Sequence, residues 1–144
     1  MEKLLRLPVR LRGIQLGRPV DLVLDREGRR GLGLEVVCGD DGHRFLPLAV
    51  GHRGADAIEL RSPLVLLAEN ELAFYTSRGS TFASLRGSEV LARGEFVGTL
   101  EDLVLAVDGS IETAVVATGD GPREVAFSRD VTLGRPGRDV KAAS

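Results

Sequence analysis

The most constraining feature of this chain is a pair of similar stretches, DLVLDREG at 21–28 and DLVLAVDG at 102–109. They extend upstream alike, because Gly17 and Gly98 each stand four residues before the shared aspartate. Leu22 and Leu24 share one face of an extended segment and a glycine-containing break follows, as in a strand with one buried face. We interpret the pair as one strand and turn, duplicated in tandem.

Weaker matches in the same order support the duplication. An offset of 81 pairs Leu34 with Val115, and an offset of 79 pairs Asp41-Gly42 with Asp120-Gly121. The tripeptide LRG occurs at 11–13 and again at 85–87, which predicts seven additional residues in the second copy, around LARGEFV. On this alignment the first copy lacks one hairpin. The two copies also differ, since 25–27 is charged where 106–108 is largely apolar, so we expect specific binding where they differ.

Period-two alternation predicts short strands separated by Gly and Asp turns. The alternating apolar positions are Val20, Leu22 and Leu24; Leu32, Leu34 and Val36; Leu46, Leu48 and Val50; and Leu103, Leu105 and Val107. Strands spaced by about ten residues favour a meander or small barrel over βαβ units. Asp108-Gly109 and Asp120-Gly121 predict two-residue hairpin turns.

One segment has a helical pattern. Glu69–Arg78 places Leu72 and Tyr75 three residues apart, and Gly79 stands where a helix often ends. A second short helical turn is expected from Thr81 to Arg86. Because Phe74, Tyr75 and Phe82 are half of the six aromatic residues, we expect this connector to pack between the two halves.

Composition narrows the class of protein. The chain has 144 residues, 43% of them hydrophobic, which suffices for one domain or two small ones with small cores. A formal charge of −2 gives no support for general attraction to nucleic acid or anionic lipid. The apolar run 64–68 is far shorter than the ~20 residues of a membrane helix, and the N-terminus lacks a signal-peptide pattern, so we expect a soluble cytoplasmic protein without membrane insertion.

The second copy resembles the opening of a PRC-barrel domain. That pattern has a Leu-x-Gly-x-x-Val start, a second Gly, and Gly-x-Leu-x-Asp-Leu-Val before an Asp-Gly turn. Its matching residues are Leu85, Gly87, Val90, Gly94, Gly98, Leu100, Asp102, Leu103, Val104, Asp108 and Gly109. The first copy matches at Leu11, Gly13, Gly17, Asp21, Leu22, Val23, Asp25 and Gly28.

The resemblance implies an all-β protein of two small antiparallel barrels in tandem. We place one unit at 7–68, a helical connector at 69–84, a second unit at 85–134 and a flexible tail at 135–144. Family members occur in the cytoplasmic H subunit of the photosynthetic reaction centre and in a ribosome-maturation factor, where the domain binds a larger assembly. A non-catalytic scaffold or adaptor is therefore expected; the alternatives are an RNA-processing or ribosome-assembly factor and an accessory subunit of a membrane electron-transfer complex.

The residues that could carry chemistry favour structural roles. Asp21 and Asp102 are expected to serve the backbone near a strand bend, and Gly17, Gly28, Gly98 and Gly109 to mark turns of the fold. His43 and His52, with Asp40, Asp41 and Cys38 nearby, have neither the spacing of a metal site nor a third partner for a reactive thiol. We therefore expect no catalytic residue, metal or cofactor, and the single cysteine excludes an internal disulfide.

Candidate partner-binding residues form two groups. Arg29, Arg30, Arg44 and Arg53 surround the turns of the first copy, and Phe74, Tyr75 and Arg78 lie in the connector. The competing interpretation of the first group is that its arginines are solvated or form salt bridges. The competing interpretation of the second group is that its aromatic side chains pack in the core. Edge strands of small barrels invite pairing, so we expect a protein partner and a homodimer, with RNA or a ribosomal assembly possible.

Overall fold

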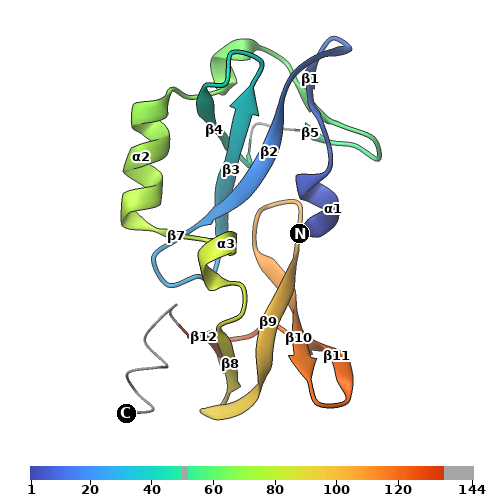
Figure 1. Ribbon diagram of the computed structural model, residues 1–144, viewed down its shortest axis with the longest axis vertical. Helices are drawn as coiled ribbons and strands as arrows, with labels where there is room; N and C mark the ends of the chain where they lie inside the picture. Colours follow the sequence, from blue (N-terminus) through green and yellow to red (C-terminus); the bar gives the residue numbers. More distant parts are fainter. Residues whose placement is uncertain (50–51, 135–144) are drawn as a thin grey trace.

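A computed structural model describes residues 1–49 and 52–134 of the chain. Two β-sheets, one from each half of the sequence, are stacked along the long axis of the molecule (Figure 1). Strands dominate, so the prediction of an all-β protein is confirmed. The predicted tail 135–144 and Val50 of a predicted strand lie outside the described residues.

The first sheet follows the order β4-β3-β2-β1-β6-β5, with β7 paired to β2. Its strands are β1 (Val9–Leu11), β2 (Ile14–Leu24), β3 (Gly31–Cys38), β4 (His43–Pro47), β5 (His52–Arg53), β6 (Ile58–Leu60) and β7 (Ser80–Thr81). Strand β1 pairs with β6 in parallel, whereas its pairing with β2 is antiparallel. The expectation of purely antiparallel strands is therefore wrong at this pair.

The second sheet follows the order β11-β10-β9-β8-β12. Its strands are β8 (Glu89–Ala92), β9 (Glu95–Leu105), β10 (Ile111–Thr118), β11 (Gly121–Ala126) and β12 (Val131–Leu133). The helical segments are α1 (Glu2–Leu5), a 3-10 turn at Pro63–Val65, α2 (Glu69–Arg78) and α3 (Phe82–Leu85). Both predicted helical segments of the connector are thus present, as α2 and α3.

The halves repeat the same plan, but with a different alignment from the expected one. Strands β2 and β9 both have 11 residues and start 81 positions apart. The hairpin before β2 turns at Arg12 and Gly13, with φ of 51° and 81°, and the hairpin before β9 turns at Arg93 and Gly94, with φ of 53° and 78°. Positive φ at both positions is the geometry of a type I′ turn. The first copy therefore does not lack a hairpin, and the LRG alignment at offset 74 is wrong.

The offset of 81 also relates the helices that precede the two hairpins, α1 and α3. It relates Leu4 to Leu85, Val9 to Val90, Gly17 to Gly98, Leu22 to Leu103 and Gly28 to Gly109. Beyond the next loop the offset becomes 80, because Leu34 pairs with Leu22 as Ala114 pairs with Leu103. The expected match of Leu34 with Val115 is therefore wrong by one residue.

A β-bulge changes which residues of β2 are buried. The pairing of β2 with β3 shifts between Pro19 and Asp21, so Val20 lacks an opposite residue, and its side chain is 46% exposed. The expectation that Val20 shares a buried face with Leu22 and Leu24 is wrong for this reason. Strand β9 shifts at the equivalent Glu101, which shows that the bulge belongs to the repeated plan.

The loop at Asp108-Gly109 is longer than the predicted two-residue hairpin. Strand β9 ends at Leu105 and β10 begins at Ile111, so the connection covers 106–110. Gly109 has a φ of 89°, and a Cβ on it would lie 2.6 Å from the carbonyl oxygen of Gly31. This close approach allows the Gly31 N–H to donate to the Gly109 oxygen at 2.8 Å, which joins the two halves.

The halves also exchange contacts through their short helices. The Ala83 N–H of α3 donates to the Asp21 carboxylate of β2 at 3.0 Å, and the Glu2 N–H of α1 donates to Asp102 of β9 at 3.3 Å. Ala83 is 81 residues after Glu2, so the two contacts are reciprocal, as across a twofold axis. Burial raises the pKa of Asp21, while the N–H groups of Ala83 and Leu22 oppose that rise.

One hydrophobic core extends across the junction. Its buried members include Leu22, Leu24 and Leu34 from the first half and Leu103, Leu105 and Val116 from the second half. Leu4 of α1 and Phe82 and Leu85 of α3 complete it. The expectation of small separate cores is therefore wrong, because each sheet covers its apolar face with the other sheet and with both exchanged helices.

Helix α2 lies on the outer face of the first sheet and not between the halves (Figure 1). Leu72 packs there with Val23 and Phe45, and the Tyr75 ring stacks on the Phe45 ring with centroids 4.5 Å apart. Of the three connector aromatics only Phe82, in α3, enters the shared core. The predicted position of α2 is wrong, because the apolar outer face of the first sheet binds it.

We predict that Gly33→Ala lowers the free energy of unfolding by about 2 kcal/mol, because a Cβ at Gly33 would lie 2.4 Å from the Phe45 ring. Gly39→Ala is the matched control, since its Cβ would meet no atom within 4 Å. Urea unfolding of both variants measures the difference. Equal stability of the two would show that Phe45 does not lie across β3.

Candidate functional site

The junction of the two halves carries two pockets, which we call the polar groove and the apolar pocket. The polar groove, of about 540 Å³, is lined by Arg26, Glu27, Gly28, Arg29, Ser77, Arg78, Gly79, Ser80, Ser84, Leu85, Thr132 and Leu133. The apolar pocket, of about 150 Å³, is lined by Leu4, Leu34, Leu46, Pro47, Leu48, Arg53, Ile58, Leu105, Ala106 and Val107.

The internal repeat relates the two pockets. The loop after β2 contributes Arg26 to the polar groove, and the equivalent loop after β9 contributes Val107 to the apolar pocket. Leu85 of α3 and its equivalent Leu4 of α1 occupy the corresponding walls. Each pocket therefore combines a loop from one half with a helix from the other half.

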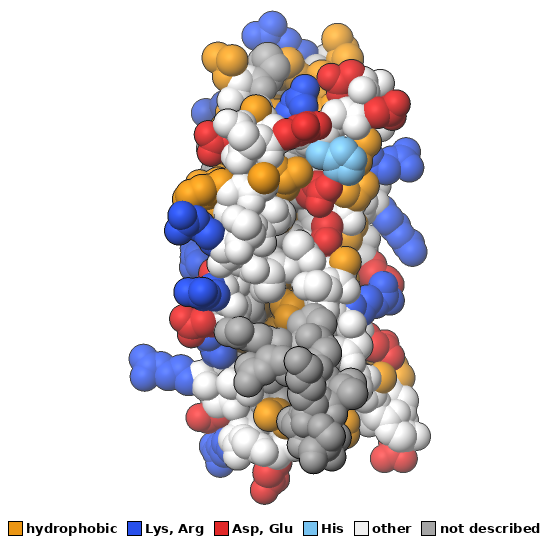
Figure 2. Space-filling model, turned by 60° about the vertical axis from the view of Figure 1, so that its left-hand side comes forward, with side chains coloured by type: hydrophobic (Ala, Val, Ile, Leu, Met, Phe, Trp, Pro, Cys, Tyr) orange, Lys and Arg blue, Asp and Glu red, His pale blue; other side chains and the backbone are white. Residues whose placement is uncertain are grey.

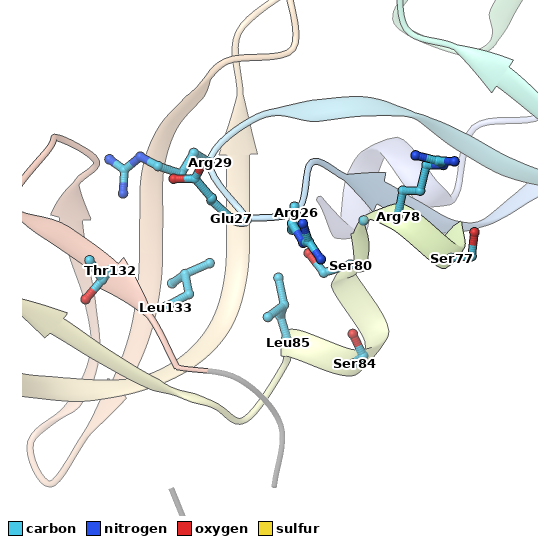
Figure 3. A pocket seen from close by; sticks show the side chains of 12 residues that line it. Arg26, Glu27, Arg29, Ser77, Arg78, Ser80, Ser84, Leu85, Thr132 and Leu133 are labelled. Atoms are coloured by element: carbon cyan, nitrogen blue, oxygen red, sulfur yellow. The ribbon is translucent and has the colours of Figure 1, made fainter. Parts of the chain in front are cut away.

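The polar groove has basic residues at its rim and leucines inside. Figure 3 shows Leu85 and Leu133 within it, while the guanidinium groups of Arg29 and Arg78 point away. Arg29 donates to the carbonyl oxygens of Val131 at 2.7 Å and Ser128 at 2.6 Å. Its guanidinium also lies 4.9 Å from the centre of the Phe127 ring. Arg29 thus ties the first half to the C-terminal strand of the second half.

The apolar pocket has one charged group. The Arg53 guanidinium makes a long contact of 3.5 Å with the Leu105 carbonyl oxygen, and no described carboxylate forms an ion pair with it. At the rim, Val107 is 88% exposed at the tip of its loop. An exposed valine beside an apolar pocket is suited to contact an apolar ligand.

The predicted arginine cluster is divided among different surroundings. Arg30 donates to the Asp108 carbonyl oxygen at 2.7 Å across the junction, and Arg44 forms an ion pair with Asp40 at 3.3 Å. Arg29 and Arg53 line different pockets. Arg29 and Arg30 therefore have structural contacts, and of the four arginines Arg53 has the guanidinium least engaged by described groups.

The connector residues form a small surface cluster. Phe74 is 48% exposed, its ring packs edge-on against Tyr75, and the Arg78 guanidinium lies 4.5 Å from its centre. Tyr75 is instead committed to its stack on Phe45. Phe74 and Arg78 remain available to a partner, and their predicted binding role stays a prediction.

The histidine and cysteine region does not form a metal site among the described residues. The His43 Nδ1 atom lies 2.5 Å from the Glu35 carboxylate, and Asp40 pairs with Arg44 instead. Cys38 is half-buried, and burial raises the pKa of its thiol, which lowers the share of reactive thiolate. No described helix is long and apolar enough to cross a membrane.

The fold-marking residues lie at equivalent points of the two halves. Gly17 and Gly98 lie in β2 and β9, and Gly28 and Gly109 lie in the following loops with positive φ. Asp21 and Asp102 accept the backbone N–H of the next residue at 2.8 and 2.9 Å in addition to the helix contacts. Both carboxylates thus satisfy backbone donors.

The two pockets differ in their chemistry. The described lining of the polar groove holds hydroxyl groups, arginines and Glu27, whereas that of the apolar pocket is apolar apart from Arg53. The sequence does not reveal the apolar pocket, because its lining residues Leu4, Leu48, Ile58 and Val107 belong to no recognisable motif. The contrast between 25–27 and 106–108 was the one signal that pointed to it.

We predict that Arg29→Ala lowers the free energy of unfolding by about 2 kcal/mol, since it removes two charged hydrogen bonds across the junction. The matched variant Arg26→Ala, at an exposed position of the same loop, should change it by less than about 0.5 kcal/mol. Thermal and urea unfolding measure both. Tolerance of Arg29→Ala would show that Arg29 is free for a ligand.

Comparison with known proteins leaves the family open. No protein-family model matches the chain, and no curated protein matches it. The resemblance to PRC-barrel domains stays a prediction based on the repeated residues.

Proposed function

We propose that this chain is a non-catalytic protein of PRC-barrel type, which acts as a protein-binding scaffold or adaptor in a larger assembly. The observation that carries the proposal is the exposed Val107, which stands beside an apolar pocket at the junction of two similar halves. Interface cores are characteristically apolar clefts into which a few anchor side chains insert. A second copy of the chain is one candidate partner.

The asymmetry of the halves supports this proposal. Val23 of the first sheet is fully buried by α2, whereas the equivalent Val104 is 39% exposed. Glu112 and Glu124, both exposed, replace Leu32 and Phe45 in the second half. The outer face of the second sheet thus carries carboxylates where the first sheet carries apolar side chains, so the two halves offer different surfaces to a partner.

We predict that a photo-reactive phenylalanine analogue at Val107 or Arg26 crosslinks a defined partner in cells, because both loop tips stand at the junction pockets. The same analogue at exposed Glu124 on β11 is the control. Mass spectrometry identifies the products, including a crosslinked second copy. Crosslinking at neither loop above the Glu124 level would contradict the proposed function.

An RNA-processing or ribosome-assembly role is the second candidate. Arg26 and Arg78 line the polar groove, where they could contact phosphates. Figure 2, however, shows acidic and basic side chains mixed over the face that it presents, which favours a protein partner over a phosphate backbone.

We predict that, if RNA is the partner, affinity for a single-stranded oligonucleotide falls steeply between 50 and 200 mM salt, because phosphate contacts release counterions. Arg26→Gln should weaken binding, whereas Arg123→Gln on the exposed strand β11 should not. Fluorescence anisotropy measures both. Absent or salt-independent binding would exclude this role.

A further inference from the structure

We infer that the apolar pocket is an anchor site for one apolar side chain of a partner protein, with an acidic residue next to it whose carboxylate binds Arg53. This inference rests on the proposed function and names the chemistry of the partner. Three observations carry it: the size of the pocket, the charge at its rim, and its contrast with the polar groove.

The volume of the apolar pocket limits the size of the partner group that can enter it. The pocket holds about 150 Å³ and is walled by aliphatic groups from β3, β4, β6, α1 and the loop after β9. An apolar cavity of about this volume accommodates a benzene-sized group. One Phe or Leu side chain therefore fits, whereas a longer lipid chain does not.

The positive charge of Arg53 determines which partner group suits the position beside the apolar pocket. Arg53 is exposed, lines the pocket, and has only the 3.5 Å contact with the Leu105 carbonyl oxygen among the described residues. A guanidinium favours a carboxylate, with which it forms paired charge-assisted hydrogen bonds. A carboxylate adjacent to the inserted side chain would thus complement the pocket.

The loop beside the polar groove carries an arginine that the loop beside the apolar pocket lacks. In the polar groove the loop residue Arg29 bonds the Val131 and Ser128 carbonyls and covers the Phe127 ring. The loop after β9 is one residue shorter and has no equivalent of Arg29, because the Ser110 carbonyl oxygen accepts from Ala106 as the Arg30 carbonyl oxygen accepts from Asp25. The loop beside the apolar pocket therefore has no arginine of its own, and Arg53 from the first half is the charged group that lines this pocket.

The probe is the capped tetrapeptide acetyl-Ala-Phe-Glu-Ala-amide, added to the full-length, ¹⁵N-labelled protein. We expect amide shift changes at Leu48, Ile58 and Val107, with a Kd on the order of millimolar, as befits one anchor. Replacing Phe by Ala in the peptide should abolish the changes. Replacing Glu by Gln should weaken binding about threefold.

Two variants distinguish the contribution of the inserted Phe side chain from that of the Glu carboxylate. In Arg53→Gln the Glu and Gln peptides should bind equally, whereas the control Arg26→Gln should keep their difference. Val107→Asp, at an exposed position that should not affect folding, should weaken both peptides. Shift changes elsewhere, or equal binding of the Phe and Ala peptides, would overturn the inference. Cellular crosslinking at Arg26 without peptide binding would overturn it too, yet leave the proposed function intact.

Discussion

The fold depends on the exchange of short helices between the two halves. Asp21 and Asp102 each accept a backbone N–H from the helix that belongs, by sequence, to the other half. Because each helix also inserts a leucine, Leu4 or Leu85, into the common core, neither sheet covers its apolar face without the other half. The pockets at the junction follow from this exchange, since each has walls from both halves.

The two sheets differ in what covers their outer faces. The first keeps an apolar outer cluster of Val23, Phe45 and Leu72 beneath α2, and Gly33 makes room for the Phe45 ring. The second sheet has Glu112 and Glu124 at the positions equivalent to Leu32 and Phe45, and no described helix lies above them. One sheet thus has a helix on its outer face, whereas the other presents this face to water.

The sequence predicted the repeated strand and loop, most strand positions and both connector helices, because alternation and glycine breaks are local signals. It misplaced Val20, since a bulge leaves no trace in apolar periodicity, and it missed the Arg12-Gly13 turn, because Arg in a left-handed conformation is not a turn signal. The position of α2 and the walls of the apolar pocket could not be predicted, since they depend on contacts between distant segments.

The reciprocal contacts across the junction give this chain the geometry of a symmetric dimer within one polypeptide. In a true homodimer every substitution is made twice, so both junction pockets must stay identical. Here Arg26 and Val107, although equivalent in position, are encoded separately. Covalent joining of the halves therefore lets one pocket change its ligand preference while the other continues to hold the structure together.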